Sequence, residues 1–290
     1  IRIALAQTHW PGSRAKAADA YSTLIADAAR AGAQLVCLPE FTLSPYFPGS
    51  RDKAGFGWAE PLRGGPSDEV FSALAGEHGV TIVASIFECD EADVYWDTAT
   101  VHDPDGRLVH FTRKVHIPSG EAYHETDFFG GAADYPVHDL GAIKLAAPTC
   151  YDQWFPELAR IYALEGAELI FYPTAIGSEP NAPDFDSKGA WQTVMRGHAV
   201  ANGLFIAAAN RTGREGQVTF YGSSFICDPG GAILAEGSRT GTDLVVADLD
   251  PAALAQWREL FPLLHQRRPA TYGRLGEGPD ASVVRPTWLS

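Results

Sequence analysis

Short apolar segments alternate with helical segments along nearly the whole of this 290-residue chain. A short apolar run between turn residues is typical of a buried strand, whereas apolar residues at helical spacing that end at a glycine indicate a helix. This alternation favours an α/β domain with helices packed on mixed sheets. We expect strands at residues 1–7, 34–38, 80–87, 98–102, 107–111, 143–147, 169–172, 204–209, 218–227, 232–236 and 244–249. We expect helices at residues 15–31, 67–79 (capped by Ser67 and ended by Gly79), 156–164, 188–202 and 251–260.

No internal repeat, low-complexity tract or linker divides the sequence. We therefore expect one domain over residues 1–264, with two mixed β-sheets and helices on the outer faces. From residue 265 onward the chain is polar and contains Pro269, Pro279 and Pro286. A terminal segment of this composition either frays or packs on another subunit, and we expect residues 265–290 to pack on a partner.

The chain is acidic, with 36 Asp and Glu residues against 22 Lys and Arg residues and a net charge of −14. Such a surface repels nucleic acid and anionic membranes, and it attracts a cationic substrate more readily than an anionic one. No apolar run approaches the roughly 20 residues that span a bilayer. The N-terminal run is too short for a signal peptide and is predicted as a strand. We therefore expect no nucleic-acid partner and no membrane partner.

The four cysteines, Cys37, Cys89, Cys150 and Cys227, are far apart and form no Cys-x-x-Cys pair. This usage does not fit a disulfide framework, so we expect a reducing, cytoplasmic location. The histidines form no His-Glu-x-x-His motif and no zinc-finger spacing. The glycine-rich segment at residues 55–60 lacks the last glycine of a dinucleotide loop, and no Gly-x-Ser-x-Gly is present. We expect neither a metal site nor a cofactor.

Cys150 lies at the end of an apolar segment, residues 142–149, and just before a helix that is expected to begin at Pro156. A residue at such a strand-to-helix turn is held rigidly. The backbone N–H groups and the positive helix end there stabilise a thiolate and a developing oxyanion. The alternative is a buried structural thiol, since free cysteine packs as a small apolar residue. The residues that accompany Cys150 separate these two interpretations.

Three further ionisable residues stand near the ends of strand-like segments. Glu40 and Lys114 each follow an apolar run, and Glu125 lies 11 residues after Lys114. Ligand sites in open α/β sheets gather at the carboxyl ends of strands. Together these groups suit acyl transfer, because a carboxylate takes the thiol proton, the thiolate attacks a carbonyl carbon and the ammonium stabilises the oxyanion. Taken singly, each is also consistent with a capping carboxylate, a solvated cation or a surface acid.

Three ordered motifs resemble the Glu, Lys and Cys motifs of the nitrilase (carbon–nitrogen hydrolase) superfamily: Leu38-Pro39-Glu40, Lys114-Val115-His116-Ile117-Pro118 and Cys150-Tyr151-Asp152. The resemblance implies a four-layer αββα sandwich that pairs into a homodimer, often within larger assemblies. It implies Glu40 as general base, Lys114 as oxyanion stabiliser and Cys150 as the nucleophile that forms a thioester. It further implies that Glu125 positions Lys114 and the substrate, and that the backbone N–H of Tyr151 is an oxyanion donor.

Within the superfamily, the chain resembles the branch of N-carbamoylputrescine amidohydrolases, chiefly through residues 152–157 and 171–180. This resemblance implies a linear ureido substrate with a distal ammonium, which needs an acid at the far end of the pocket. We assign that role to Glu179. The other residues expected at the substrate are Tyr151, Tyr46, His124, Trp154 and Thr174.

Several positions depart from the pattern of that branch. Leu43 replaces a usual glutamate, His124 replaces a usual glutamine, and Trp96-Asp97-Thr98 replaces Tyr-Asn-Ser. The segment Ala147-Pro148-Thr149 replaces the usual Gly and Ile/Val before the cysteine. These changes fall where the pocket is expected, and they leave the four catalytic candidates intact.

Three functions remain open at this stage. The first is hydrolysis of an N-carbamoyl amine. The second is hydrolysis of an aliphatic or aromatic amide, or of a nitrile, which an apolar lining from Tyr46, Phe47, Tyr123 and Trp154 suits equally. The third is a non-catalytic binding subunit with the nitrilase fold, against which the intact set of four catalytic candidates argues.

Overall fold

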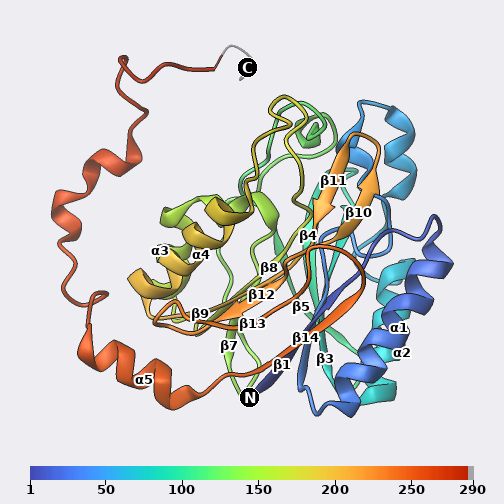
Figure 1. The fold of residues 1–290 in the computed structure, drawn as a ribbon, viewed down its shortest axis with the longest axis horizontal. Coiled ribbons are helices and arrows are strands. Elements are labelled where there is room, and N and C mark those ends of the chain that lie inside the picture. Colours follow the sequence, from blue (N-terminus) through green and yellow to red (C-terminus); the bar gives the residue numbers. More distant parts are fainter. Residues whose placement is uncertain (287–290) are drawn as a thin grey trace.

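The computed structural model describes residues 1–286 and contains two six-stranded β-sheets that lie face to face (Figure 1). The first sheet has the order β14 (Asp243–Asp248), β1 (Arg2–Gln7), β2 (Leu35–Cys37), β3 (Thr81–Cys89), β4 (Tyr95–His102) and β5 (Leu108–Arg113). The second has the order β13 (Ile233–Glu236), β12 (Phe225–Cys227), β9 (Phe205–Ala209), β8 (Leu169–Pro173), β7 (Lys144–Ala146) and β6 (His138–Asp139). A separate hairpin joins β10 (Thr212–Glu215) to β11 (Val218–Tyr221).

One pair of helices covers the outer face of each sheet (Figure 1). Helices α1 (Arg14–Arg30) and α2 (Pro66–His78) pack on the first sheet, and α3 (Pro156–Leu164) and α4 (Lys188–Asn202) pack on the second. Helix α5 (Pro251–Leu260) follows the edge strand β14. This layer order confirms the predicted αββα sandwich of the α/β class. Within the described residues, no helix has both the length and the apolar character that a membrane crossing requires.

Side-chain alternation along the strands builds the apolar layers. Leu5 of β1 and Leu35 of β2 point between the sheets, where Phe171 of β8 also lies. Their neighbours Ala4 and Val36 point to the opposite face, against α1 and α2. Successive residues of a strand face opposite sides, so a sheet that is covered on both faces needs strands that are apolar throughout. That requirement is why the continuous apolar runs of the sequence indicate strands.

The strand directions bring several strand ends to one edge of the sandwich. Strands β1, β2 and β3 are parallel, β4 is antiparallel to β3, and β5 is antiparallel to β4. Strand β5 therefore points the same way as β2, so Glu40 and Lys114 emerge at the same edge of the first sheet. In the second sheet β7, β8 and β9 are parallel, and Cys150 follows the carboxyl end of β7.

The apolar run at residues 218–227 forms two strands, so the prediction of one strand is wrong. Strand β11 ends at Tyr221, β12 begins at Phe225, and the two belong to different sheets. Between them, Gly222 and Ser223 have φ values of 55° and 57°. This left-handed conformation is incompatible with extended backbone. Apolar composition alone does not reveal this positive-φ turn. The predictions also omitted strand β10, the partner of β11, because residues 212–215 are not an apolar run.

The predicted capping role of Ser67 is also wrong. Helix α2 begins at Pro66 with Gly65 as its N-cap residue, and Ser67 lies buried in the first turn. The Ser67 N–H and hydroxyl each donate to the Glu60 carboxylate, at 2.7 Å. A carboxylate from outside the helix thus satisfies its free N-terminal donors. Gly79 ends the helix with a φ of 64°, as predicted.

Beyond α5 the chain leaves the body of the molecule and runs past the outer side of α3 and α4 (Figure 1). This segment contains the 3-10 turns η5 (Pro269–Thr271) and η6 (Gly273–Gly276). Leu275 and Val284 in it expose 65% and 88% of their surfaces. The predicted tail, residues 265–290, includes residues 287–290, which lie outside the described residues.

Gly222→Ala is expected to lower the free energy of unfolding by about 2–4 kcal/mol, because it combines left-handed strain with crowding. An alanine Cβ would lie 2.6 Å from the Ser238 backbone oxygen and 2.8 Å from Gln7 Nε2. Gly12→Ala is the matched control, since Gly12 has a φ of 92° but nothing within 4 Å. Urea unfolding midpoints measure the difference. Equal midpoints for the two variants would contradict the steric explanation.

Candidate active site

Lys114 lies among three carboxylates at the edge of the first sheet. Its Nζ is 2.7 Å from Glu40 Oε1 and 2.5 Å from Glu125 Oε2. Asp97 Oδ2 of strand β4 lies 3.2 Å from the same nitrogen. All four side chains are buried. Burial of an ammonium requires this kind of pairing, because each of its protons then faces an oxygen in place of water.

A tight turn after β2 fixes Glu40. The next residue, Phe41, has a φ of 48°, a conformation that persists only where the surroundings impose it. The Phe41 N–H donates to Ser85 Oγ at 3.0 Å, and the Thr42 N–H donates to the Ser85 backbone oxygen at 2.9 Å. Strand β3, which carries Ser85, therefore determines where the Glu40 carboxylate lies.

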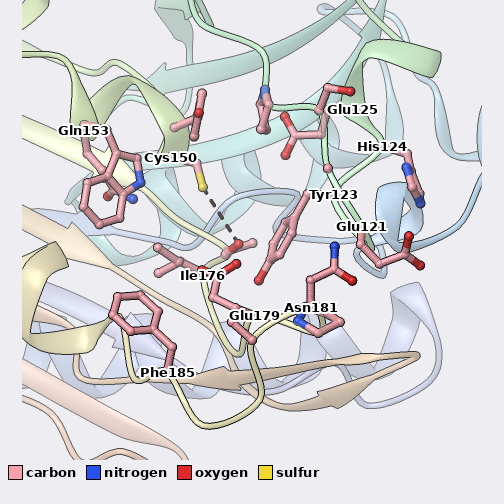
Figure 2. A pocket seen from close by; sticks show the side chains of 18 of the residues that line it. Glu121, Tyr123, His124, Glu125, Cys150, Gln153, Ile176, Glu179, Asn181 and Phe185 are labelled. Carbon is pink, nitrogen blue, oxygen red and sulfur yellow. Dashed lines mark hydrogen bonds between the residues drawn. The ribbon is translucent and has the colours of Figure 1, made fainter. Parts of the chain in front are cut away.

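Cys150 occupies a second strained turn. It is the first residue of the 3-10 turn η4 (Cys150–Trp154), and its φ is 42°. The side chain is 6% exposed, and Sγ lies 3.8 Å from the backbone oxygen of Ala175. Figure 2 shows the sulfur pointing into a cavity. The residue thus lies between β7 and α3, as the sequence predicts, with η4 interposed before the helix.

Asp152 ties the turn at Thr149 to the segment that follows Lys114. Its carboxylate accepts the N–H groups of Thr149, Val115 and His116, at 3.3, 3.2 and 2.8 Å. The His116 Nδ1 lies 2.7 Å from the same carboxylate. A buried carboxylate with several donors makes a rigid junction. This junction fixes the thiol relative to the ammonium.

Glu125 is held from the side opposite Lys114. It opens the 3-10 turn η3 (Glu125–Asp127), and its Oε1 accepts the Tyr46 hydroxyl at 2.8 Å. The Tyr46 N–H in turn donates to Glu215 Oε2 at 2.7 Å. Both oxygens of Glu125 therefore have partners, and Tyr46 acts on the site through this carboxylate.

Burial controls protonation in the cluster. It raises the pKa of Glu40 well above the usual range, and the Lys114 charge opposes this only in part. It likewise raises the pKa of Glu125 against the effect of Lys114. Burial alone lowers the pKa of Lys114, but the charges of Glu125, Glu40 and Asp97 together hold that pKa well above its ordinary value. Lys114 therefore stays a cation, and the carboxyl groups around it compete for protons.

The surroundings of Cys150 favour the protonated thiol. Burial raises its pKa well above the usual value, the charges of Glu40 and Glu125 add to this, and Lys114 opposes it. Burial thus opposes the thiolate that the strand-to-helix turn was expected to stabilise. A neutral thiol needs a base beside it. Glu40 has an oxygen to spare, since its Oε2 has no hydrogen-bond partner among the described residues.

A cavity of about 770 Å³ opens onto Cys150. In Figure 2, Tyr123 faces the sulfur, Glu125 lies above it, and Glu179 and Asn181 lie below. The lining includes the aromatic residues Tyr123, Tyr151, Trp154 and Phe185, the acids Glu121, Glu125 and Glu179, and the basic residues Arg51 and His124. Such a wall combines apolar area with a few polar groups, which is typical of a small-molecule site.

Four of the residues predicted to contact a substrate line this cavity: Tyr151, His124, Trp154 and Glu179. Thr174 does not line it. Its hydroxyl donates to the backbone oxygen of Tyr172 at 3.0 Å and lies fully buried behind the wall. Tyr46 does not line it either and contacts Glu125 instead.

Sequence reasoning missed several residues of the site. Asp97 was visible as a departure from a motif, but its contact with Lys114 arises only when β4 pairs with β5. Gln153 and Phe185 line the cavity from positions without a distinctive pattern. Arg51 reaches the cavity from the segment after the turn η1 (Phe47–Gly49). No local signal in the sequence points to these last three.

One oxygen each from Glu40, Asp97 and Glu125 lies within 4.8 Å of the other two, as carboxylates also do around a metal ion. Here the Lys114 ammonium lies among these oxygens. A side chain of this chain therefore supplies one positive charge among these three carboxylates.

Comparison with known proteins agrees with this geometry. The sequence profile described as Carbon-nitrogen hydrolase matches residues 2–259. A citrullinase from Francisella tularensis is 39% identical over 280 residues, which cover 95% of this chain and 98% of that protein. An N-carbamoylputrescine amidase from Arabidopsis thaliana is 36% identical over 258 residues, 86% of each protein.

Among solved structures, a carbon-nitrogen hydrolase from Helicobacter pylori G27 superposes with a TM-score of 0.90 at 34% identity, covering 96% of this chain and 98% of that chain. The match of fold, sequence and profile confirms the resemblance inferred from the three motifs. This chain belongs to the carbon–nitrogen hydrolase (nitrilase) family and is an enzyme of that family.

Proposed function

We propose that the enzyme hydrolyses the carbon–nitrogen bond of a linear N-carbamoyl amine, such as N-carbamoylputrescine, through a thioester on Cys150. The observation that carries this proposal is the buried Lys114 ammonium, which Glu40 and Glu125 hold beside a thiol that opens into a cavity. Relatives named for carbamoyl substrates support the substrate class.

In the first half of the reaction, the Cys150 thiol gives its proton to Glu40 and the sulfur attacks the carbamoyl carbon. The carbonyl oxygen becomes an oxyanion, which the Lys114 ammonium and the backbone N–H of Tyr151 stabilise. As the C–N bond breaks, Glu40 passes the proton to the departing nitrogen, and ammonia or the amine leaves. The acyl group stays on sulfur as a thioester, with Glu125 holding Lys114 in place.

In the second half, Glu40 takes a proton from water, and the resulting hydroxide adds to the thioester carbon. The same donors stabilise the second oxyanion. The C–S bond then breaks, and the departing sulfur of Cys150 regains the proton from Glu40. With N-carbamoylputrescine, the final products are putrescine, carbon dioxide and ammonia.

Glu179 provides the anchor for a distal ammonium. It is half-buried on the cavity wall, where burial raises the pKa of its carboxyl while a hydrogen bond from Ser187 opposes that change. A carboxylate that is partly removed from water attracts a cation more strongly than an exposed one. The net charge of −14 also favours approach of a cation. A ureido amine thus fits with its carbamoyl end at Cys150 and its ammonium at Glu179.

A ureido amino acid such as citrulline is the second candidate. It adds a carboxylate to the same two groups, and Arg51 lines the cavity that Glu179 lines. The Arg51 guanidinium is 69% exposed and lies 3.5 Å from Asp127, so only a weak surface ion pair competes with a substrate carboxylate. The 39% identity to a citrullinase favours the same candidate.

Cys150→Ala is expected to lower the rate of ammonia release by at least about 10³-fold, because no other group replaces the nucleophile. Cys89→Ala is the matched control, since it removes a half-buried free thiol at the end of β3, away from the cavity lining. Both variants and the wild type are assayed with N-carbamoylputrescine, citrulline, 3-ureidopropionate and an aryl acetamide.

A fully active Cys150→Ala variant would contradict the thioester mechanism. If kcat/KM were higher for the aryl acetamide than for N-carbamoylputrescine and citrulline, the proposed mechanism would stand but the proposed substrate class would be wrong. If the folded wild type turned over none of the four, the non-catalytic alternative would gain support.

Glu179→Gln is expected to raise KM for N-carbamoylputrescine by about 10- to 100-fold, because it removes one charge-assisted hydrogen bond to the substrate ammonium. The change in kcat is expected to be smaller. Glu121→Gln is the matched control, because Glu121 lines the same cavity but is exposed. For butylurea, which lacks the ammonium, KM is expected to change little in either variant.

The pH dependence of KM tests the same role of Glu179. Because the pKa of Glu179 is raised, its carboxylate takes up a proton at a higher pH than a free glutamate does, and KM for the diamine is expected to rise early as pH falls. If Glu121→Gln rather than Glu179→Gln raised KM, the anchor would be assigned to Glu121.

We further propose that the domain at residues 1–264 forms a homodimer or a larger homo-oligomer, with the tail packed on a partner. The tail presents exposed apolar side chains such as Leu275 and Val284, which a monomer leaves in water. Light scattering is expected to give at least twice the mass of one chain, and truncation after Leu264 is expected to lower the mass or weaken association. A monomeric full-length chain at micromolar concentration would contradict this proposal.

A further inference from the structure

The charges around Lys114 do not balance. One ammonium faces the carboxyl groups of Glu40, Asp97 and Glu125, and these side chains are at most 1% exposed. With all three carboxyls ionised, the cluster would carry an excess of negative charge without access to water. An uncompensated buried charge is costly, and neighbouring carboxyl groups avoid that cost by sharing a proton. One pair of these carboxyls therefore has reason to hold a proton.

Asp97 and Glu40 are the two carboxyl groups that we expect to share this proton. Asp97 lies farther from Lys114 Nζ, at 3.2 Å, than the other two carboxylates do, so its charge is the least compensated. Among the described residues, Glu40 Oε2 has no hydrogen-bond partner, and Asp97 Oδ2 has none beyond its 3.2 Å ion pair with Lys114 Nζ. Glu125 offers no such oxygen, because Tyr46 and Lys114 occupy both of its oxygens. A carboxyl proton between Asp97 and Glu40 satisfies both groups.

Ser85 holds these two carboxyl groups in register. Its hydroxyl donates to Asp97 Oδ1 at 3.1 Å and accepts the Phe41 N–H at 3.0 Å. Phe41 directly follows Glu40, so one hydroxyl sets the position of both acids. Because Asp97 Oδ1 already accepts from Ser85, the shared proton is placed at Oδ2, which also forms the longest ion pair of Lys114, at 3.2 Å.

We propose that Asp97 is a positioning residue that holds one proton in common with Glu40 in the resting enzyme. The proposal rests on the proposed role of Glu40 as general base. The pair holds one proton at rest and two after the Cys150 thiol has given up its own, and it returns one to the departing nitrogen. The pair keeps its shared proton throughout, and Glu40, whose Oε2 has no hydrogen-bond partner among the described residues, takes up the thiol proton.

The shared proton sets the pH at which the base becomes active. The groups that face the pair are the Lys114 ammonium, the Glu125 carboxyl and the Cys150 thiol, together with the Ser85 hydroxyl. After burial and the charges, a hydrogen bond with Asp97 also raises the pKa of Glu40. An amide at position 97 keeps the shape but removes the charge and the proton. Glu40 then ionises at lower pH.

Asp97→Asn is expected to move the acid limb of the kcat/KM profile to lower pH by about one unit or more, while turnover persists at a reduced level. Asp105→Asn is the matched control, since it removes an exposed carboxylate from the turn of the same β4–β5 hairpin. The control is expected to leave the limb in place. A fall in kcat/KM at every pH without movement of the limb would show a structural role only and would overturn the proposal.

A second readout does not depend on turnover. Infrared spectra of the resting protein at pH 7 are expected to show a protonated carboxyl band that both Asp97→Asn and Glu40→Gln weaken. A wild-type band identical to that of Asp97→Asn would overturn the shared proton, whatever the substrate. A band of the expected kind in a protein that hydrolyses no ureido compound would reject the proposed function and leave the shared proton standing.

Discussion

The ion cluster around Lys114 is the constraint on which the rest of the site depends. A buried ammonium is stable only when nearby carboxylates compensate it, and those carboxylates are stable only while the ammonium is present. The partners come from segments far apart in the chain: Glu40 follows β2, Asp97 lies on β4, and Glu125 opens η3. The cluster therefore exists only when the first sheet and its loops have closed together.

One buried polar junction links the two sheets, and another fixes the Glu40 turn within the first sheet. Asp152 joins the Cys150 turn to the segment after Lys114, and Ser85 joins the Glu40 turn to β3. Both turns carry a positive φ on a residue with a side chain, at Phe41 and Cys150. Strain of this kind persists where surrounding contacts outweigh it. Here the contacts that outweigh the strain also aim the reacting groups.

Burial gives the thiol and the acids their chemistry. It raises the pKa of Cys150, which favours a neutral thiol, and it raises the pKa of Glu40, which makes that carboxylate a stronger base than a surface glutamate. A stronger base beside a weaker acid eases proton transfer at the moment of attack. The third carboxyl of the cluster, Asp97, adds to the same effect. The site thus differs from one in which a preformed thiolate waits at a helix end.

Periodicity in the sequence by itself determined most of the strands and helices and the α/β class. The three motifs, through their resemblance to a known family, indicated the αββα sandwich and singled out Glu40, Lys114 and Cys150. Only the tertiary structure decided that residues 218–227 divide between two sheets, since a positive φ leaves no mark on apolar composition. It alone placed Thr174 behind the cavity wall and Asp97 against Lys114. Contacts between distant segments, and the burial that sets each pKa, arise only when the layers pack.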